Sequence, residues 1–137
     1  MCMEHLDKFF DCRVDEKHRE VQFEIGGFWT TEEIRPVLDK LSTAALTFII
    51  PRVPFHGLGN MEHLVPQSRE TAQAVRDNLM SAKKHGLRRV AIINPPVLMK
   101  LQYKRIAEGM EVEFFETEAD AKAWLRRPTE AGASEAA

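Results

Sequence analysis

Two histidines and a nearby glutamate are the residues of this chain that come closest to a metal site. His56 and His63 lie in the stretch IIPRVPFHGLGNMEHLVPQS, positions 49–68, and Glu62 is the nearest further ligand type. Zinc in proteins takes three or four protein ligands, and the glycine-rich segment after His56 is a poor helix former. We therefore expect no tightly bound metal and no cofactor. An enzyme that uses His56 or His63 is the least favoured interpretation.

The same stretch contains a lone G-x-G, formed by Gly57 and Gly59. A loop that binds phosphate needs more glycine and a helix that opens directly behind it, but Pro66 and other residues intervene here. The two glycines are more typical of turns that need a positive φ angle. The chain also has no G-x-S-x-G motif and no cysteine near an expected helix start. These observations predict no catalytic residues.

Ser68 directly precedes an expected helix and has two interpretations. As an N-cap, its hydroxyl would accept a main-chain N–H group of the first turn, an interaction worth about 1 kcal/mol. As a phosphoacceptor, it would place a dianion at the positive end of the helix dipole. The N-cap is the favoured interpretation, and Ser68 is the candidate phosphoacceptor of the chain.

Apolar side chains are frequent between residues 51 and 67, which we expect to form a long loop. Such a loop could cover a pocket for a small apolar or lipid-like ligand, because ligand pockets are lined mainly by apolar side chains with a few polar groups among them. The candidate pocket residues are Val53, Phe55, His56, Leu58, Met61, His63 and Leu64.

The helix expected over residues 96–109 has two apolar stripes, roughly opposite each other on a helical wheel. A surface helix needs only one apolar face, so the second is either deeply buried or a contact surface. We expect one stripe to pack on the sheet and the other to meet a second protein chain, most simply another copy of this one. The candidate interface residues are Leu98 and Leu101 in one stripe and Met99, Tyr103 and Ile106 in the other.

The bulk composition is that of an ordinary soluble domain. The chain has 137 residues, of which 29% are charged, and its net charge of −2 gives no reason to expect nucleic acid as a partner. Two cysteines exclude a disulfide framework. The N-terminal sequence MCMEHLDKFF is not a signal peptide, and no run approaches the roughly 20 apolar residues of a membrane span. We expect a cytoplasmic protein.

The first half of the chain predicts a hairpin, a helix and a buried strand. Residues 8–15 and 21–25 alternate apolar and polar side chains, as half-buried strands do, and the polar segment between them favours an antiparallel hairpin. Thr30 and Glu33 form a capping box ahead of apolar residues at helical spacing. ALTFII, residues 45–50, is almost entirely apolar, which predicts a strand covered on both faces.

The second half alternates helices with two further buried strands, RVAII at 89–93 and VEFF at 112–115. A capping box at Thr117 opens the last helix. The order β-β-α-β-α-β-α-β-α predicts an α/β fold with a mostly parallel sheet, an antiparallel strand at its N-terminal edge and flanking helices. We expect a single domain over residues 1–126 and a frayed tail over 127–137.

The segments RVAII, LQYKR, VEFF and ETEADAKAWL together resemble the SpoIIAA-like family, small bacterial proteins with the fold of STAS domains. Phe115 at a strand end, followed by Trp124 and Leu125 in the last helix, is similar to that family's closing pattern. The resemblance covers residues 8–126 and implies the STAS fold, with a function in docking to other proteins. It also implies that some relatives are switched by phosphorylation, usually at an Asp-Ser pair. This chain has no Asp-Ser pair there, and Ser68 is the serine nearest the helix start.

The leading hypothesis is therefore a non-enzymatic binding or regulatory module of STAS fold that acts through protein–protein contacts, with itself or with another protein as partner. The alternative is a carrier of a small apolar or lipid-like ligand under the 51–67 loop. Neither hypothesis requires a cofactor, a nucleic acid or a membrane span.

Overall fold

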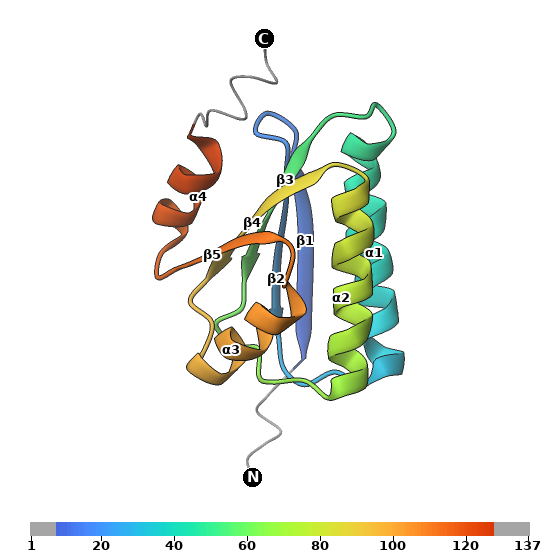
Figure 1. Cartoon of the computed structure of the whole chain (residues 1–137), viewed down its shortest axis with the longest axis vertical. Coiled ribbons are helices and arrows are strands. Elements are labelled where there is room, and N and C mark those ends of the chain that lie inside the picture. The colour runs from blue at the N-terminus through green and yellow to red at the C-terminus, as the bar shows by residue number, and fades with distance from the viewer. Residues whose placement is uncertain (1–7, 128–137) are drawn as a thin grey trace.

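The computed structural model describes residues 8–127, and within them the elements follow the order β-β-α-β-α-β-α-β-α, as predicted (Figure 1). Residues 128–137, which make up most of the predicted tail, lie outside the described residues. The elements are β1 Phe9–Asp15, β2 Glu20–Gly26, α1 Thr31–Ile49, β3 Phe55–Asn60, α2 Arg69–Lys84, β4 Leu87–Ile93, α3 Val97–Ile106, β5 Glu111–Phe115 and α4 Glu118–Arg126.

The five strands form one sheet in the order β1-β2-β3-β4-β5. β1 pairs antiparallel with β2, and each later pair of neighbours is parallel, which confirms the predicted fold class. In the hairpin, Val14 lies opposite Val21 and Cys12 lies opposite Phe23. One face of both strands is therefore apolar, and the charged residues between these positions point to the other face because side chains alternate along a strand.

Helices cover the two faces of the sheet unequally. α1, α2 and α3 pack on one face over the larger core, while α4 packs on the other face over β3, β4 and β5 (Figure 1). Strands β3 to β5 therefore bury side chains on both faces, as parallel strands usually do. The smaller core, beneath α4, consists of Leu58, Ala91, Ile93, Ala121 and Leu125, with Phe115 and Trp124 packed against it.

The predicted strand at residues 45–50 is wrong, because these residues complete α1 and its C-cap. The helix begins behind the predicted capping box, in which both hydrogen bonds are present. Ala45 and Phe48 are buried and continue the inner stripe of the helix, whereas Leu46 and Ile50 are exposed on its outer side. A short apolar run looks the same in a buried strand and at the end of an amphipathic helix, and here the helix prevails.

The predicted loop at residues 51–67 is wrong in its middle, where β3 forms the central strand of the sheet. Its sequence, FHGLGN, conceals the strand because glycine weakens strands and is typical of turns. At Gly59 a Cβ atom would lie 2.2 Å from Cζ of Phe23, whose ring reaches over from β2 and would have to move. The true connections on either side of the strand are residues 51–54 and 61–68.

A buried ion pair fastens α4 to the hairpin. Arg126 donates from Nε and Nη2 to the two carboxylate oxygens of Glu20, at 2.9 Å each, and Glu20 is completely buried. Gln22 donates a third hydrogen bond to this carboxylate at 2.9 Å. Burial by itself raises the pKa of Glu20, but the hydrogen bonds from Arg126 and Gln22 outweigh burial and hold the pKa below its ordinary value. Glu20 therefore stays ionised at neutral pH.

Candidate ligand-binding site

An apolar cavity of about 330 Å³ lies between the sheet and helices α1, α2 and α3. Its volume falls at the lower end of the roughly 300–1,000 Å³ that is usual for small-molecule sites. α1 contributes its inner stripe, including the segment at 45–50 that was predicted as a strand. Representative lining residues are Val21 and Ile25 of β2, Leu41, Ala45 and Ile49 of α1, Phe55 and Gly57 of β3, Leu79 of α2, Val90 of β4, and Met99, Tyr103 and Ile106 of α3.

Only some of the predicted pocket residues line the cavity. Phe55, Met61 and Leu64 line the cavity. Leu58 instead packs under α4, because it is an odd number of positions from Phe55 and so points to the opposite face of the sheet. Val53 is half-buried in the connection ahead of β3, and it packs against the larger core without lining the cavity.

The two predicted histidines do not meet at the cavity. His56 follows Phe55 on β3 and so points away from the face that lines it. His63 is exposed in the connection after β3, where its ring lies edge-on to Phe9 with 6.1 Å between ring centres. Across residues 8–127, no three His, Cys, Asp or Glu side chains are grouped so that they could hold a metal ion.

Gly57 forms part of the cavity floor, and its role was not apparent from the sequence. A Cβ atom at this position would lie 3.5 Å from Val90 and 3.9 Å from Leu87, both ordinary van der Waals distances. No neighbouring side chain therefore requires glycine here, in contrast to Gly59. Glycine inside a strand often marks a place where a ligand approaches the backbone closely. The available signal was a strand-interior glycine, but it could be recognised only once β3 was known to be a strand.

Two glutamines join the loops at one end of the cavity. The side chain of Gln67 accepts the main-chain N–H of Trp29 at 2.8 Å and donates to the carbonyl of Gly27 at 3.0 Å. Gln102 of α3 in turn accepts the main-chain N–H of Gln67 and donates to its carbonyl, both at 2.8 Å. These bonds fix α3 relative to the segments that lead into α1 and α2. Sequence reasoning missed both residues, because each contact spans more than thirty positions.

The remaining polar groups of the lining are few. Asn78 of α2 donates to the hydroxyl of Ser42 of α1 at 3.0 Å. His85 donates from Nδ1 to the carbonyl of Ser81 at 2.8 Å. Tyr103 of α3 is only 4% exposed, and burial raises the pKa of its phenol. The phenol is therefore protonated at neutral pH and can act as a hydrogen-bond donor.

Ser68 is the N-cap of α2, as its favoured interpretation predicted. Its Oγ accepts the N–H of Thr71 at 3.2 Å and donates to the Thr71 hydroxyl at 3.1 Å. Thr71 is completely buried and donates in turn to the carbonyl of Trp29 at 2.9 Å. The cap therefore connects the start of α2 to the segment before α1. Phosphorylation of Ser68 stays a prediction.

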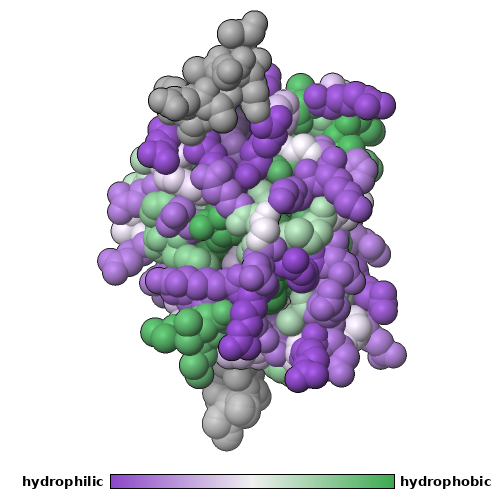
Figure 2. Space-filling view, in the orientation of Figure 1, coloured by the Kyte–Doolittle hydropathy of each residue, from purple (hydrophilic) through white to green (hydrophobic). Residues whose placement is uncertain are grey.

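The two apolar stripes of α3 have different surroundings. Met99, Tyr103 and Ile106 are buried against the cavity, which removes them from the candidate interface. Leu98 and Leu101 are 67% and 52% exposed, and Val97 beside them is 73% exposed. These three residues, the α3 stripe, belong to the apolar cluster seen over α3 at the lower left of Figure 2.

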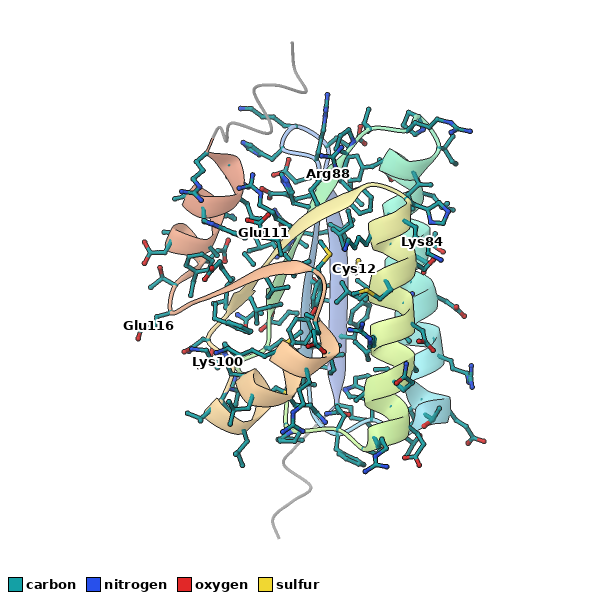
Figure 3. All side chains as sticks on the ribbon, in the orientation of Figure 1. Cys12, Lys84, Arg88, Lys100, Glu111 and Glu116 are labelled. Atoms are coloured by element: carbon teal, nitrogen blue, oxygen red, sulfur yellow. The ribbon has the colours of Figure 1, made fainter. Side chains whose placement is uncertain are left out.

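A second hollow, of about 400 Å³, lies between α3 and β5 and is lined by charged as well as apolar residues. Lys100, labelled in Figure 3, places its Nζ 5.3 Å from the centre of the Phe114 ring, and Lys104 lies 6.0 Å from the same ring. Both ammonium groups are therefore already in cation–π contact with the protein. The apolar cavity is the better candidate for a ligand site.

A mixed five-stranded sheet with three helices on one face and one on the other places this protein in the class of STAS-like α/β domains. The sequence model described as SpoIIAA-like matches residues 20–126, and the chain belongs to the SpoIIAA-like family. The chain is similar to an uncharacterised protein of the DUF3478 family from Shewanella loihica PV-4, whose crystal structure is described as having a SpoIIAA-like fold. The two are 27% identical with a TM-score of 0.62, and the match covers 87% of this chain and 95% of the other.

Two further findings give no indication of a particular function. No curated protein matches the chain. None of the helices within residues 8–127 is long and apolar enough to cross a membrane. The family match and the solved structure therefore establish the fold and the family, and the function has to be argued from the cavity and the surface.

Proposed function

We propose that this protein acts by binding, and that its ligand is a small, mostly apolar molecule held in the cavity beneath α1, α2 and α3. The observation that carries the proposal is the cavity itself, about 330 Å³ of space with an almost entirely apolar lining. A partly open apolar cavity of this size is of the kind that binds small molecules.

The contact of the apolar wall with water also supports an occupant. The cavity is partly open, so its apolar wall is in contact with water when no ligand is bound. An apolar ligand would remove this wall from water, and burial and dispersion contacts would then stabilise the complex.

The chemistry of the cavity wall supports binding over catalysis. The wall within the described residues contains no Asp, Glu, Lys or Arg. The raised pKa of Tyr103 makes its phenol a poor general base. Membership of the SpoIIAA-like family is consistent with this proposal, since STAS-fold domains often serve as regulatory binding modules.

Native mass spectrometry of the full chain, purified without added ligand, tests the proposal. We expect the mass of the chain plus a small apolar molecule that organic extraction removes. A Gly57→Val variant, whose side chain would occupy the cavity, should lack this adduct. Ala123→Val is the matched control, because Ala123 is exposed on α4 across the sheet, and it should keep the adduct. An unliganded wild type that also fails to bind small apolar probes would contradict the proposal.

A second candidate function is self-association through the α3 stripe, which the exposure of Val97, Leu98 and Leu101 supports. Water-exposed apolar side chains grouped on one helix face often mark a protein contact. The occupant we propose is a second copy, because an apolar stripe is complementary to itself across a two-fold axis without any need to match charges.

Analytical ultracentrifugation tests self-association. Leu98→Glu should shift a dimer to monomer, and Ile50→Glu is the matched control because Ile50 is also an exposed aliphatic residue, at 74%, but lies at the end of α1. Both substitutions are at exposed sites, so both variants should keep a wild-type melting temperature within a few degrees. A wild type that sediments as a monomer at high micromolar concentration would remove the support for this candidate.

A further inference from the structure

A buried residue of the cavity wall carries a hydroxyl group that has no hydrogen-bond partner among the described residues. The hydroxyl of Tyr103 neither donates nor accepts a hydrogen bond with any group of residues 8–127. Every completely buried polar side-chain atom in this part of the chain does have a partner. The Tyr103 oxygen therefore keeps some accessible surface, although the residue as a whole is only 4% exposed and lines the cavity.

The other buried or half-buried polar groups of the wall are already engaged. The Gln67 carboxamide has three hydrogen bonds, which include one from its Nε2 to the carbonyl of Val65 at 2.5 Å. Asn78 and Ser42 bond to each other across the two helices. Because Tyr103 lines the cavity and its hydroxyl is not engaged by the described residues, this hydroxyl is available to bond to a ligand.

We propose that the Tyr103 hydroxyl is the polar anchor of the ligand site, and that the ligand is an uncharged apolar molecule with one oxygen acceptor, such as a ketone, an ester or an ether. This inference rests on the proposed function, since it specifies what the cavity binds. The phenol is protonated, so its O–H group can donate a hydrogen bond to such an oxygen.

The charge of the ligand follows from the lining. A carboxylate placed beside Tyr103 would find no Lys or Arg on the wall that residues 8–127 form, and an unpaired buried charge is strongly unfavourable. The position of the phenol is fixed by packing: its ring lies edge-on to Phe114, with 6.5 Å between ring centres and an interplanar angle of 89°. The donor is therefore held in place before the ligand arrives.

A pair of probes of almost identical shape tests the anchor. 2-Acetylnaphthalene carries a ketone oxygen where 2-isopropylnaphthalene carries a methyl group. By isothermal titration calorimetry, the ratio of the affinities for the ketone and the hydrocarbon should be about 2- to 10-fold higher in the wild type than in Tyr103→Phe, the range expected from one hydrogen bond. Comparing the two proteins cancels the different desolvation of the two probes. Tyr103→Phe should leave the affinity for the hydrocarbon within about 2-fold, because it removes a hydroxyl group and keeps the ring.

The wild type alone offers a second measurement, because Tyr103 is the only tyrosine of the chain. The tyrosine doublet in its Raman spectrum reports the hydrogen bonding of a single phenol. Saturation with 2-acetylnaphthalene should change the intensity ratio of the doublet to the value typical of a phenol that donates a hydrogen bond. Saturation with 2-isopropylnaphthalene should not change it in this way. This measurement remains decisive if Tyr103→Phe fails to fold.

The outcomes separate this inference from the proposed function. If the ratio of the two affinities is the same in the wild type and in Tyr103→Phe, the anchor is refuted while the cavity remains a ligand site. If neither probe binds and the purified chain carries no adduct, the proposed function fails and the anchor fails with it. A ratio that shifts toward the hydrocarbon in Tyr103→Phe supports both.

Discussion

Filling the cavity floor by Gly57→Val should stabilise the ligand-free protein and weaken ligand binding. A Cβ atom at Gly57 meets Val90 at 3.5 Å and Leu87 at 3.9 Å, which is contact without a clash. The valine side chain would extend into a space that no protein atom occupies.

The expected magnitude follows from the atoms added. Valine adds three carbon atoms, and burial contributes roughly 0.8 kcal/mol for each CH₂ group. Removal of a strand-interior glycine contributes roughly 0.5–1 kcal/mol more, while ordering the side chain costs part of the gain. We expect the free energy of unfolding of the ligand-free protein to rise by about 2 kcal/mol, which corresponds to roughly 5–10 °C in melting temperature.

Urea denaturation of extracted, ligand-free protein measures the stability, and calorimetric titration with 2-isopropylnaphthalene measures binding, which should weaken at least tenfold. Gly59→Val is the contrasting variant on the same strand. Its Cβ would lie 2.2 Å from the Phe23 ring, so it should be destabilised by roughly 1–3 kcal/mol. The reasoning is refuted if Gly57→Val destabilises the protein as much as Gly59→Val, or if the probe binds it as tightly as the wild type.

Two further predictions concern the stability of the fold. Arg126→Met should lower the free energy of unfolding at pH 7 by roughly 2–3 kcal/mol, less than for a fully buried pair because the Arg126 side chain is 28% exposed. The pKa of Glu20 is lowered in the folded protein, so Glu20 stabilises the fold above its ordinary pKa of 4.5, and this stabilisation is lost as the pH falls from there through the lower pKa of the folded state. Urea denaturation should therefore show the gap between variant and wild type narrowing in acid, and a gap that is constant from pH 7 to the lowest pH at which the wild type folds would argue against the ion pair. Ser68→Ala should cost about 1 kcal/mol through loss of the N-cap, while Ser68→Asp should retain most of it; equal losses in the two variants would show that the cap is not what matters.

Local patterns in the sequence determined much of the fold. The period-two alternation around Val14 and Val21 specified the hairpin, and the capping box at Thr30 marked the start of α1. The Met99 and Leu98 stripes showed that α3 has two apolar faces. Each of these signals is complete within one element, because capping and alternation depend on residues only a few positions apart.

The end of α1 and the position of β3 could be assigned only from the tertiary structure. ALTFII has the composition of a buried strand. In the structure it continues the inner stripe of α1, with Phe48 buried and Ile50 exposed, and this packing makes it helical. FHGLGN has the composition of a turn, and only the Phe23 ring from the neighbouring strand explains why Gly59 belongs in the centre of a sheet. In both cases the deciding contacts come from elsewhere in the fold.

The cavity is the feature that no local pattern could contain. Gly57 and Gly59 are the same residue type two positions apart on one strand, yet a Cβ atom at Gly57 would make ordinary van der Waals contacts and one at Gly59 would overlap an aromatic ring. Tyr103 reads in the sequence as an amphipathic helix residue, and only the assembled layers leave its hydroxyl beside a void without a partner. A void is the space that remains after α1, α2, α3 and the sheet have packed, so its volume and the groups that face it depend on residues from the whole chain at once.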